Sequence, residues 1–193
     1  RGVRGAPSDH HCGARRAALR EPPMPTVTHS HKDQFLGVYE NEHQRTMRVL
    51  NAYPQDKLDL KPHAMSKTAR ELAWVFVLER KLGVMLMNDA FASTAPSGNP
   101  PPAPDSWFEL IGAIEAAHKE FGDLVRSLPE EKLQQTVRFF TGPKQMGDIP
   151  RMDVCWFLLH DEIHHRGQFS IYLRMAGGRV PSIYGPSADE ASF

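Results

Sequence analysis

Histidine and aspartate side chains stand one helical turn apart in residues 160–168, whose sequence is HDEIHHRGQ. Residues four positions apart on a helix lie above each other, with β-carbons about 5 to 6 Å apart. Two pairs can therefore each bind one ion: His160 with His164, and Asp161 with His165. Imidazole and carboxylate ligands together favour zinc, nickel or ferrous iron over calcium or magnesium. The spacing predicts a divalent-metal site on this helix.

Helical phase leaves open which of the two pairs faces the interior. The pairs lie about 100° apart around the helix, so only one of them is expected to face the core. An isolated ionised carboxylate cannot leave water without a large cost. If the stripe with Asp161 and His165 is internal, we therefore expect a metal, a histidine or an arginine beside Asp161.

A complete metal site needs a further protein ligand from another helix. By phase, the candidates are His43 and His118, which both lie on apolar stripes. The alternative for both is a hydrogen-bonded core histidine. The charged run Glu79, Arg80 and Lys81 is interpreted as a solvent-exposed helix face.

Four helices are predicted to position these residues. Apolar residues recur at three- and four-residue steps, and the pattern predicts helices over 31–53, 66–91, 105–128 and 151–175. The first is expected to end before Pro54, the second to begin at the N-cap Ser66, and the third at Asp105 or Ser106. Prolines in 93–104 predict a crossover loop, and 133–150 an extended connection without a sheet. The fold class is all-α: a four-helix bundle with one long crossover.

Composition and charge are those of an ordinary globular protein. The 193 residues suit one domain, and the formal net charge of zero argues against nucleic acid as a partner. The longest apolar run, 72–78, is far shorter than the roughly 20 residues that cross a bilayer, so no membrane association is expected. Cys12 and Cys155 do not resemble a disulfide framework, which favours a reducing cytoplasm. We expect Cys155 to be a small buried residue.

Residues 1–23 have no apolar periodicity and five arginines. They are interpreted as disordered upstream sequence or as a segment added by cloning, with a transit peptide as the alternative. The folded domain is expected over 24–193.

The segment 160–190, with HHRGQ followed by YLR and VPSIYGPSADE, resembles the last helix and tail of the DinB/YfiT-like family, and 58–74 resembles the entrance to its second helix. The resemblance implies an up-down-down-up bundle. It also implies a metal held by one histidine of the second helix and two histidines, four apart, of the last. Here His165 matches the second of these, Asp161 replaces the first, and Val75 falls at the second-helix position. The implied metal site is therefore degenerate.

What the resemblance implies about function is a divalent-metal-dependent enzyme of the thiol-dependent transferase type, acting on a small molecule with a low-molecular-weight thiol. The catalytic residues stay unassigned. One alternative is a non-catalytic bundle that acts as a ligand-binding or stress-associated homodimer. Another is a hydrolase in which Asp161 and a neighbouring histidine activate water. A structural alternative, in which they pin the tail 180–190 against the last helix, applies to Arg166, Gln168, Tyr172 and Arg174.

Overall fold

The structure, a computed structural model, describes residues 2, 30–90 and 100–191. The expectations for residues 1–23 and for Cys12 therefore fall on segments outside the described residues, with Gly2 as the exception. Much of the predicted crossover loop, 91–99, also lies outside them.

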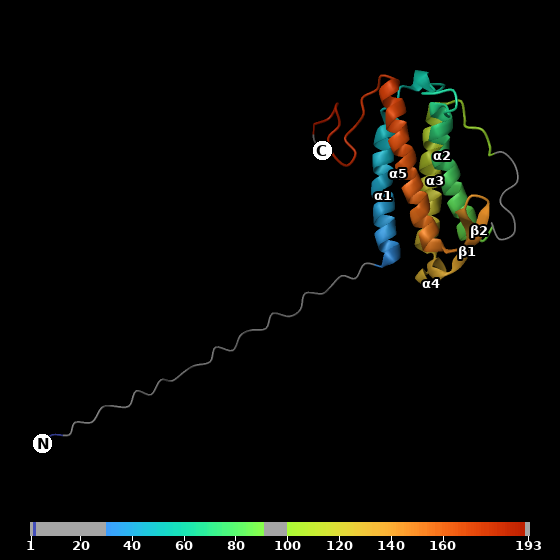
Figure 1. Cartoon of the computed structure of the whole chain (residues 1–193), viewed down its shortest axis with the longest axis vertical. Coiled ribbons are helices and arrows are strands. Elements are labelled where there is room, and N and C mark those ends of the chain that lie inside the picture. The colour runs from blue at the N-terminus through green and yellow to red at the C-terminus, as the bar shows by residue number, and fades with distance from the viewer. Residues whose placement is uncertain (1, 3–29, 91–99, 192–193) are drawn as a thin grey trace.

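Four long helices run side by side (Figure 1). They are α1 (His31–Asn51), α2 (Ala69–Met87), α3 (Trp107–Ser127) and α5 (Arg151–Met175). Each of α1 and α2 packs against both α3 and α5. In Figure 1, α1 and α5 run in one direction and α2 and α3 in the other. The predicted up-down-down-up bundle with a crossover between its second and third helices is confirmed.

Side-chain caps set where three of these helices begin. Ser30 accepts a hydrogen bond from the Asp33 N–H, and Ser106 accepts one from the Glu109 N–H. The predicted start of the second helix at Ser66 was wrong. Thr68 is the N-cap, because it forms a reciprocal capping box with Glu71. The first link contains a short 3-10 helix, η1 (Gln55–Lys57).

A two-stranded antiparallel sheet corrects the expectation of no sheet. The short helix α4 (Glu130–Gln134) leads into β1 (Thr136–Gly142), which pairs with β2 (Gln145–Pro150). The extended character of the connection was predicted correctly, but the pairing was missed. Val137 and Phe139 are buried while their neighbours are exposed, so one face of the hairpin packs on the bundle. The hairpin contacts the lower ends of α2 and α5 in the view of Figure 1.

The buried core consists of two apolar clusters separated by a polar layer. One cluster includes Leu50, Phe76 and Phe169, and the other includes Phe35 and Phe121. Along every long helix, buried polar residues occur between the residues of the two clusters. They are Glu42, His43, Thr46, Glu79, Arg80, His118, Glu162 and Arg166.

This layer overturns the interpretation of the run 79–81 as a solvent-exposed face. Glu79 and Arg80 are buried, and only Lys81 is exposed. Cys155 is fully buried, as expected, and its burial raises the pKa of the thiol to about 12. Among the described residues, no helix is both long and apolar enough to cross a bilayer.

Candidate metal centre

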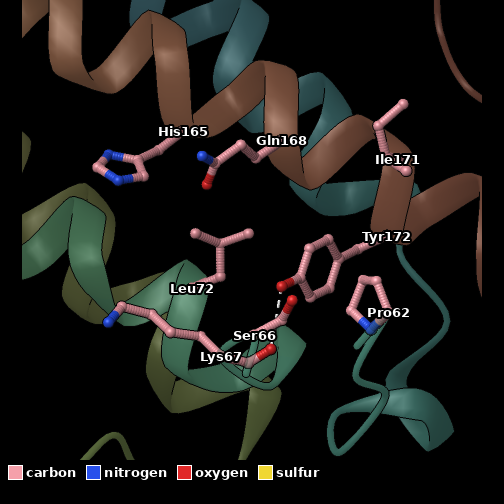
Figure 2. A pocket seen from close by; sticks show the side chains of 8 residues that line it. All are labelled: Pro62, Ser66, Lys67, Leu72, His165, Gln168, Ile171 and Tyr172. Atoms are coloured by element: carbon pink, nitrogen blue, oxygen red, sulfur yellow. Dashed lines mark hydrogen bonds between the residues drawn. The ribbon is translucent and has the colours of Figure 1, made fainter. Parts of the chain in front are cut away.

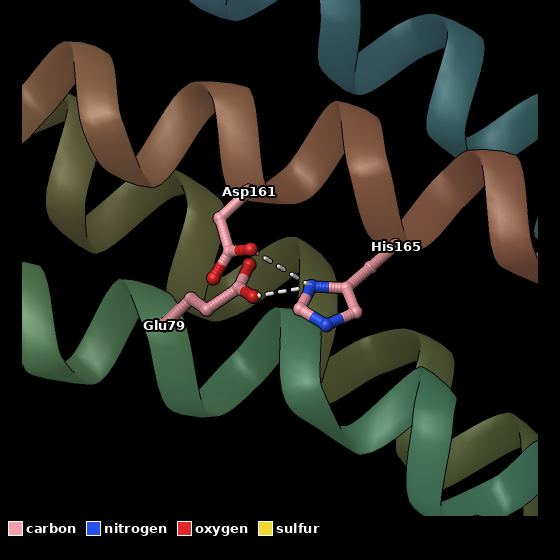
Figure 3. A group of neighbouring side chains, drawn as sticks. All are labelled: Glu79, Asp161 and His165. Carbon is pink, nitrogen blue, oxygen red and sulfur yellow. Dashed lines mark ion pairs between the residues drawn. The ribbon is translucent and has the colours of Figure 1, made fainter. Parts of the chain in front are cut away.

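Three potential ligands converge in the polar layer, where α2 packs against α5. Figure 3 shows Glu79 of α2 facing Asp161 and His165, which lie one turn apart on α5. One ligand atom from each residue lies within 4.8 Å of the other two. In the described part of the chain, no other set of three histidine, cysteine or acidic residues meets this condition.

The internal stripe of α5 explains this convergence. Val154, Leu158 and Tyr172 are buried on the same stripe as Asp161 and His165, whereas Phe157 and Ile171 on the neighbouring stripe are more than half exposed. The choice that helical phase left open is therefore settled in favour of Asp161 and His165. The expected partner for Asp161 is also present, because its Oδ1 lies 3.7 Å from Nδ1 of His165.

The separations between these atoms fit one bound ion. His165 Nδ1 lies 2.7 Å from Glu79 Oε1 and 3.7 Å from Asp161 Oδ1. Ligand atoms bound to a tetrahedral zinc ion at about 2.1 Å lie about 3.4 Å from one another. The two measured separations bracket that value, so small side-chain movements suffice to place the atoms around a cation.

Hydrogen bonding leaves this group unsatisfied. Nδ1 of His165 forms an ion pair with Oε1 of Glu79, but the two groups are not oriented as a hydrogen bond. Both carboxylate oxygens of Glu79 and Nδ1 of His165 are thus buried without a hydrogen-bond partner among the described residues. Buried polar atoms normally have a partner, and a carboxylate without one is costly. These atoms point to a cation as the missing partner.

The pKa shifts in the group show the same imbalance of charge. Burial raises the pKa of Glu79 to about 7, against the opposing effect of His165. The contact with Glu79 raises the pKa of His165, and Asp161 raises it further. Two carboxylates and one imidazole thus compete for protons that a divalent cation would replace.

A satisfied ion pair lies directly behind the candidate centre. Arg80 follows Glu79 on α2, Glu162 follows Asp161 on α5, and their side chains meet at 2.5 Å in the same helix interface. Both are almost completely buried. Thr46 of α1 donates a second hydrogen bond to Glu162 at 2.7 Å. This pair fixes the spacing between the two helices that carry the ligands.

The predicted third ligands, His43 and His118, lie elsewhere in the layer. Their rings stack on each other between α1 and α3, with centroids 3.6 Å apart. Burial, together with the charges of His118 and Arg80, lowers the pKa of His43 to about 3. Burial also lowers the pKa of His118, although Glu40 beside it acts in the opposite direction. Neither histidine belongs to the group on α5.

Glu79 is the residue that sequence reasoning missed. It lies one helical turn after Val75, the position where the family resemblance places a histidine, and both residues follow the same side of α2. The available signal was a charged pair, Glu79 and Arg80, that interrupts an otherwise apolar helix. A search one turn along from Val75 would have found an oxygen ligand.

His160 and His164 project from the exposed side of α5. His164 contacts Gln168 one turn later, with 2.8 Å between the two nitrogens. The structure does not bring either histidine into the group around Glu79. Metal binding by this second pair stays a prediction.

A groove adjoins the candidate centre. Figure 2 shows it between the start of α2 and the last turns of α5. Its volume is about 430 Å³. Its lining comprises Pro62, Ser66, Lys67, Leu72, His165, Gln168, Ile171 and Tyr172. His165 therefore belongs both to the candidate centre and to a space that can hold a small molecule.

The tail is held against α5 as the structural alternative for Arg166 and Arg174 predicted. Arg166 donates a 2.7 Å hydrogen bond to the Tyr184 hydroxyl and pairs with Glu42 at 2.6 Å. The Tyr184 hydroxyl in turn donates to Glu42. Arg174 pairs with Asp189 at 2.7 Å. These contacts assign both arginines to the scaffold.

The arrangement of the four long helices defines an up-down-down-up bundle. The model of the DinB family matches residues 24–192, and the chain therefore belongs to the DinB family.

Relatives agree with this family and with the fold. The chain is 28% identical over 158 residues to the uncharacterized protein YrdA of Bacillus subtilis (strain 168), covering 82% of this chain and 90% of that protein. The structure resembles a DinB-like protein of Bacillus cereus ATCC 10987, with a TM-score of 0.62, 21% identity and coverage of 78% and 95%. It also resembles the DinB-like protein YjoA of Bacillus subtilis, with a TM-score of 0.60, 18% identity and coverage of 77% and 95%.

Proposed function

We propose that this DinB protein is a divalent-metal-dependent enzyme of the thiol-dependent transferase type. Glu79, Asp161 and His165 are the ligands, and zinc, nickel or ferrous iron suits their mixture of nitrogen and oxygen. The observation that carries the proposal is the convergence of Glu79, His165 and Asp161, in which buried atoms of Glu79 and His165 pair with each other but make no hydrogen bond. This set replaces the histidines expected from the family resemblance.

Three protein ligands leave coordination positions open, as in catalytic rather than structural metal sites. A divalent ion held there lowers the pKa of a bound thiol or water and so supplies a nucleophile near neutral pH. The protein's own contribution is to bind and orient the small molecule. Leu72 and Tyr172 give the groove a buried apolar wall, and His165 lies where the groove meets the ligands.

The first test is elemental analysis of protein purified without chelator or nickel resin. We expect about one divalent ion per chain, and loss of that ion in Glu79→Ala and His165→Ala. His160→Ala and His164→Ala are matched controls, because they remove imidazoles from the exposed side of the same helix. Metal that stays in the first two variants and leaves in the last two would contradict the assignment.

The second test is activity. The metal-loaded protein is incubated with a panel of low-molecular-weight thiols and electrophiles, and thiol consumption is followed. We expect turnover that is lost with Glu79→Ala and retained with His160→Ala. Metal binding without turnover across the panel would favour the non-catalytic ligand-binding module.

A further inference from the structure

The groove beside the candidate centre has an uneven distribution of charge. His165 lies at the end that meets the ligands, and Figure 2 shows the side chain of Lys67, which directly precedes the N-cap of α2, extended along the opposite wall toward that same end. Lys67 is the one lysine, arginine or carboxylate residue among the described residues that line the groove. Two carboxylates, Glu79 and Asp161, lie beyond the His165 end and are committed to the proposed metal.

The Lys67 ammonium group is available for a ligand. Its Nζ atom makes no hydrogen bond or ion pair with any described residue. Glu71 lies near enough for the charge of Lys67 to lower its pKa, but its carboxylate is occupied by the Thr68 N–H in the capping box. The backbone at Lys67 is held in place, because its carbonyl accepts a 3.0 Å hydrogen bond from the Tyr172 hydroxyl.

Apart from Lys67 and His165, the lining of the groove is mostly apolar. Leu72, Ile171 and Pro62 supply carbon surface, while Ser66 and Gln168 supply polar groups. The volume of about 430 Å³ lies near the lower end of the range for small-molecule sites, about 300 to 1,000 Å³. The groove therefore suits a small ligand with one charged end, a short apolar part and a reactive group at the other end.

We propose that the groove selects anionic thiols: a carboxylate of the ligand pairs with Lys67 while its thiol lies at the His165 end. This inference rests on the proposed function for the role of the thiol, but the recognition of the carboxylate depends on Lys67 alone. A single ammonium is a point charge that matches one carboxylate, whereas tight phosphate recognition generally uses several donors. Neutral thiols of the same length gain no such pairing.

The experiment compares two thiols of similar size, 3-mercaptopropionate and 2-mercaptoethanol, by calorimetric titration into the zinc-loaded full chain. We expect the anionic thiol to bind about three- to fivefold more tightly, which is the range for a partly exposed ion pair. Lys67→Met should remove this preference, and Lys67→Arg should retain most of it. Added salt should reduce the preference in the wild-type protein.

Lys61→Met is the matched control. It removes the same charge at the same end of the molecule from an exposed lysine outside the groove lining, and it should leave the preference unchanged. An equal loss in Lys61→Met and Lys67→Met would show a general field effect and overturn the proposal. Failure of the protein to bind either thiol, or an unchanged preference in Lys67→Met, would also overturn it.

Failure of the metal proposal is detected separately. Propionate, which has no thiol, is titrated into chelator-treated wild type and Lys67→Met. Weaker propionate binding in Lys67→Met would support the anion site whether or not the protein binds metal. If elemental analysis of untreated protein then finds no metal, the metal centre is refuted and the anion site stands. If the protein holds stoichiometric metal and Lys67→Met changes the binding of neither 3-mercaptopropionate nor propionate, the anion site is refuted and the metal centre stands.

Discussion

Two regions of the polar layer contain buried atoms without hydrogen-bond partners, and they differ in charge. Between α2 and α5, the unpartnered atoms belong to Glu79 and His165, beside a second carboxylate. Between α1 and α3, they are the Nδ1 atoms of His43 and His118, whose rings stack on each other. The first region has two carboxylates beside one imidazole, whereas in the second burial lowers the pKa values of both histidines and so favours their neutral forms. Buried atoms without hydrogen-bond partners therefore indicate a bound cation only where carboxylates outnumber the groups that can neutralise them.

Arg80 lies between the two regions and influences both. It pairs with Glu162 behind the candidate centre, and its positive charge lowers the pKa values of His43 and His118. The difference between the regions therefore depends on the Arg80–Glu162 pair, and four substitutions test it.

The largest expected effect comes from Glu162→Ala. Removing one partner of a buried ion pair leaves Arg80 uncompensated, and we expect the free energy of unfolding to fall by about 3–5 kcal/mol. Urea unfolding of metal-free protein measures this. Replacing both partners, as in Arg80→Met with Glu162→Leu, should recover much of the loss, because no buried charge is then left alone. A loss below about 1 kcal/mol in Glu162→Ala would contradict this role.

Glu79→Gln should show whether Glu79 binds the metal or stabilises the fold. Because the Glu79 carboxylate makes no hydrogen bond and loses only its ion pair with the partly exposed His165, we expect a change of less than about 1 kcal/mol in the free energy of unfolding without metal. Zinc affinity should fall about 100-fold, since a charged ligand is lost. Competition with a zinc chelator gives the affinity. Glu162→Gln is the matched control, and a larger loss of zinc affinity there than in Glu79→Gln would reverse the two assignments.

The histidine pair predicts how stability depends on pH. The pKa of His43 is about 3 in the folded protein and about 6.5 in the unfolded chain, so the unfolded chain binds more protons between these values. Stability is therefore full above pH 6.5 and falls as the pH drops toward 3.

We expect His43→Phe, which keeps an aromatic ring on His118, to reduce the loss of stability between pH 7 and pH 5 by about 1–2 kcal/mol. Urea unfolding at each pH, with chelator present, measures the difference. His160→Phe changes an exposed histidine and should follow the wild type. If it flattens the pH profile as much as His43→Phe does, the stacked pair is not the source.

The smallest effect is expected at the tail. Tyr184→Phe removes the hydroxyl that joins Glu42 to Arg166, but those two residues stay paired. We expect a loss of about 1 kcal/mol in the free energy of unfolding, and no change in zinc affinity. A substantial fall in zinc affinity would show that the tail contributes to the centre.

Local sequence determined the elements of this protein well. The apolar spacing predicted α1, α3 and α5 with nearly their observed ends, because a helix that buries one face needs that repeat. The motif around HHRGQ indicated the family and its bundle, and placed His165 and Asp161 as ligands. The hairpin was missed, since the pairing of β1 with β2 depends on how Val137 and Phe139 pack against the bundle.

Only the tertiary structure decided which other charges belong to the centre. Helical phase indicated His43 and His118 as further ligands, because a histidine on an apolar stripe is expected to point into the bundle. Glu79 and Arg80 looked exposed, because charged residues usually are. Whether a buried charge is neutralised depends on what the neighbouring helix places opposite it, and on this basis Glu162 and Glu79 have different roles. Which side chains lie opposite each other is set by how the helices pack, and the spacing of residues within one helix does not specify that packing.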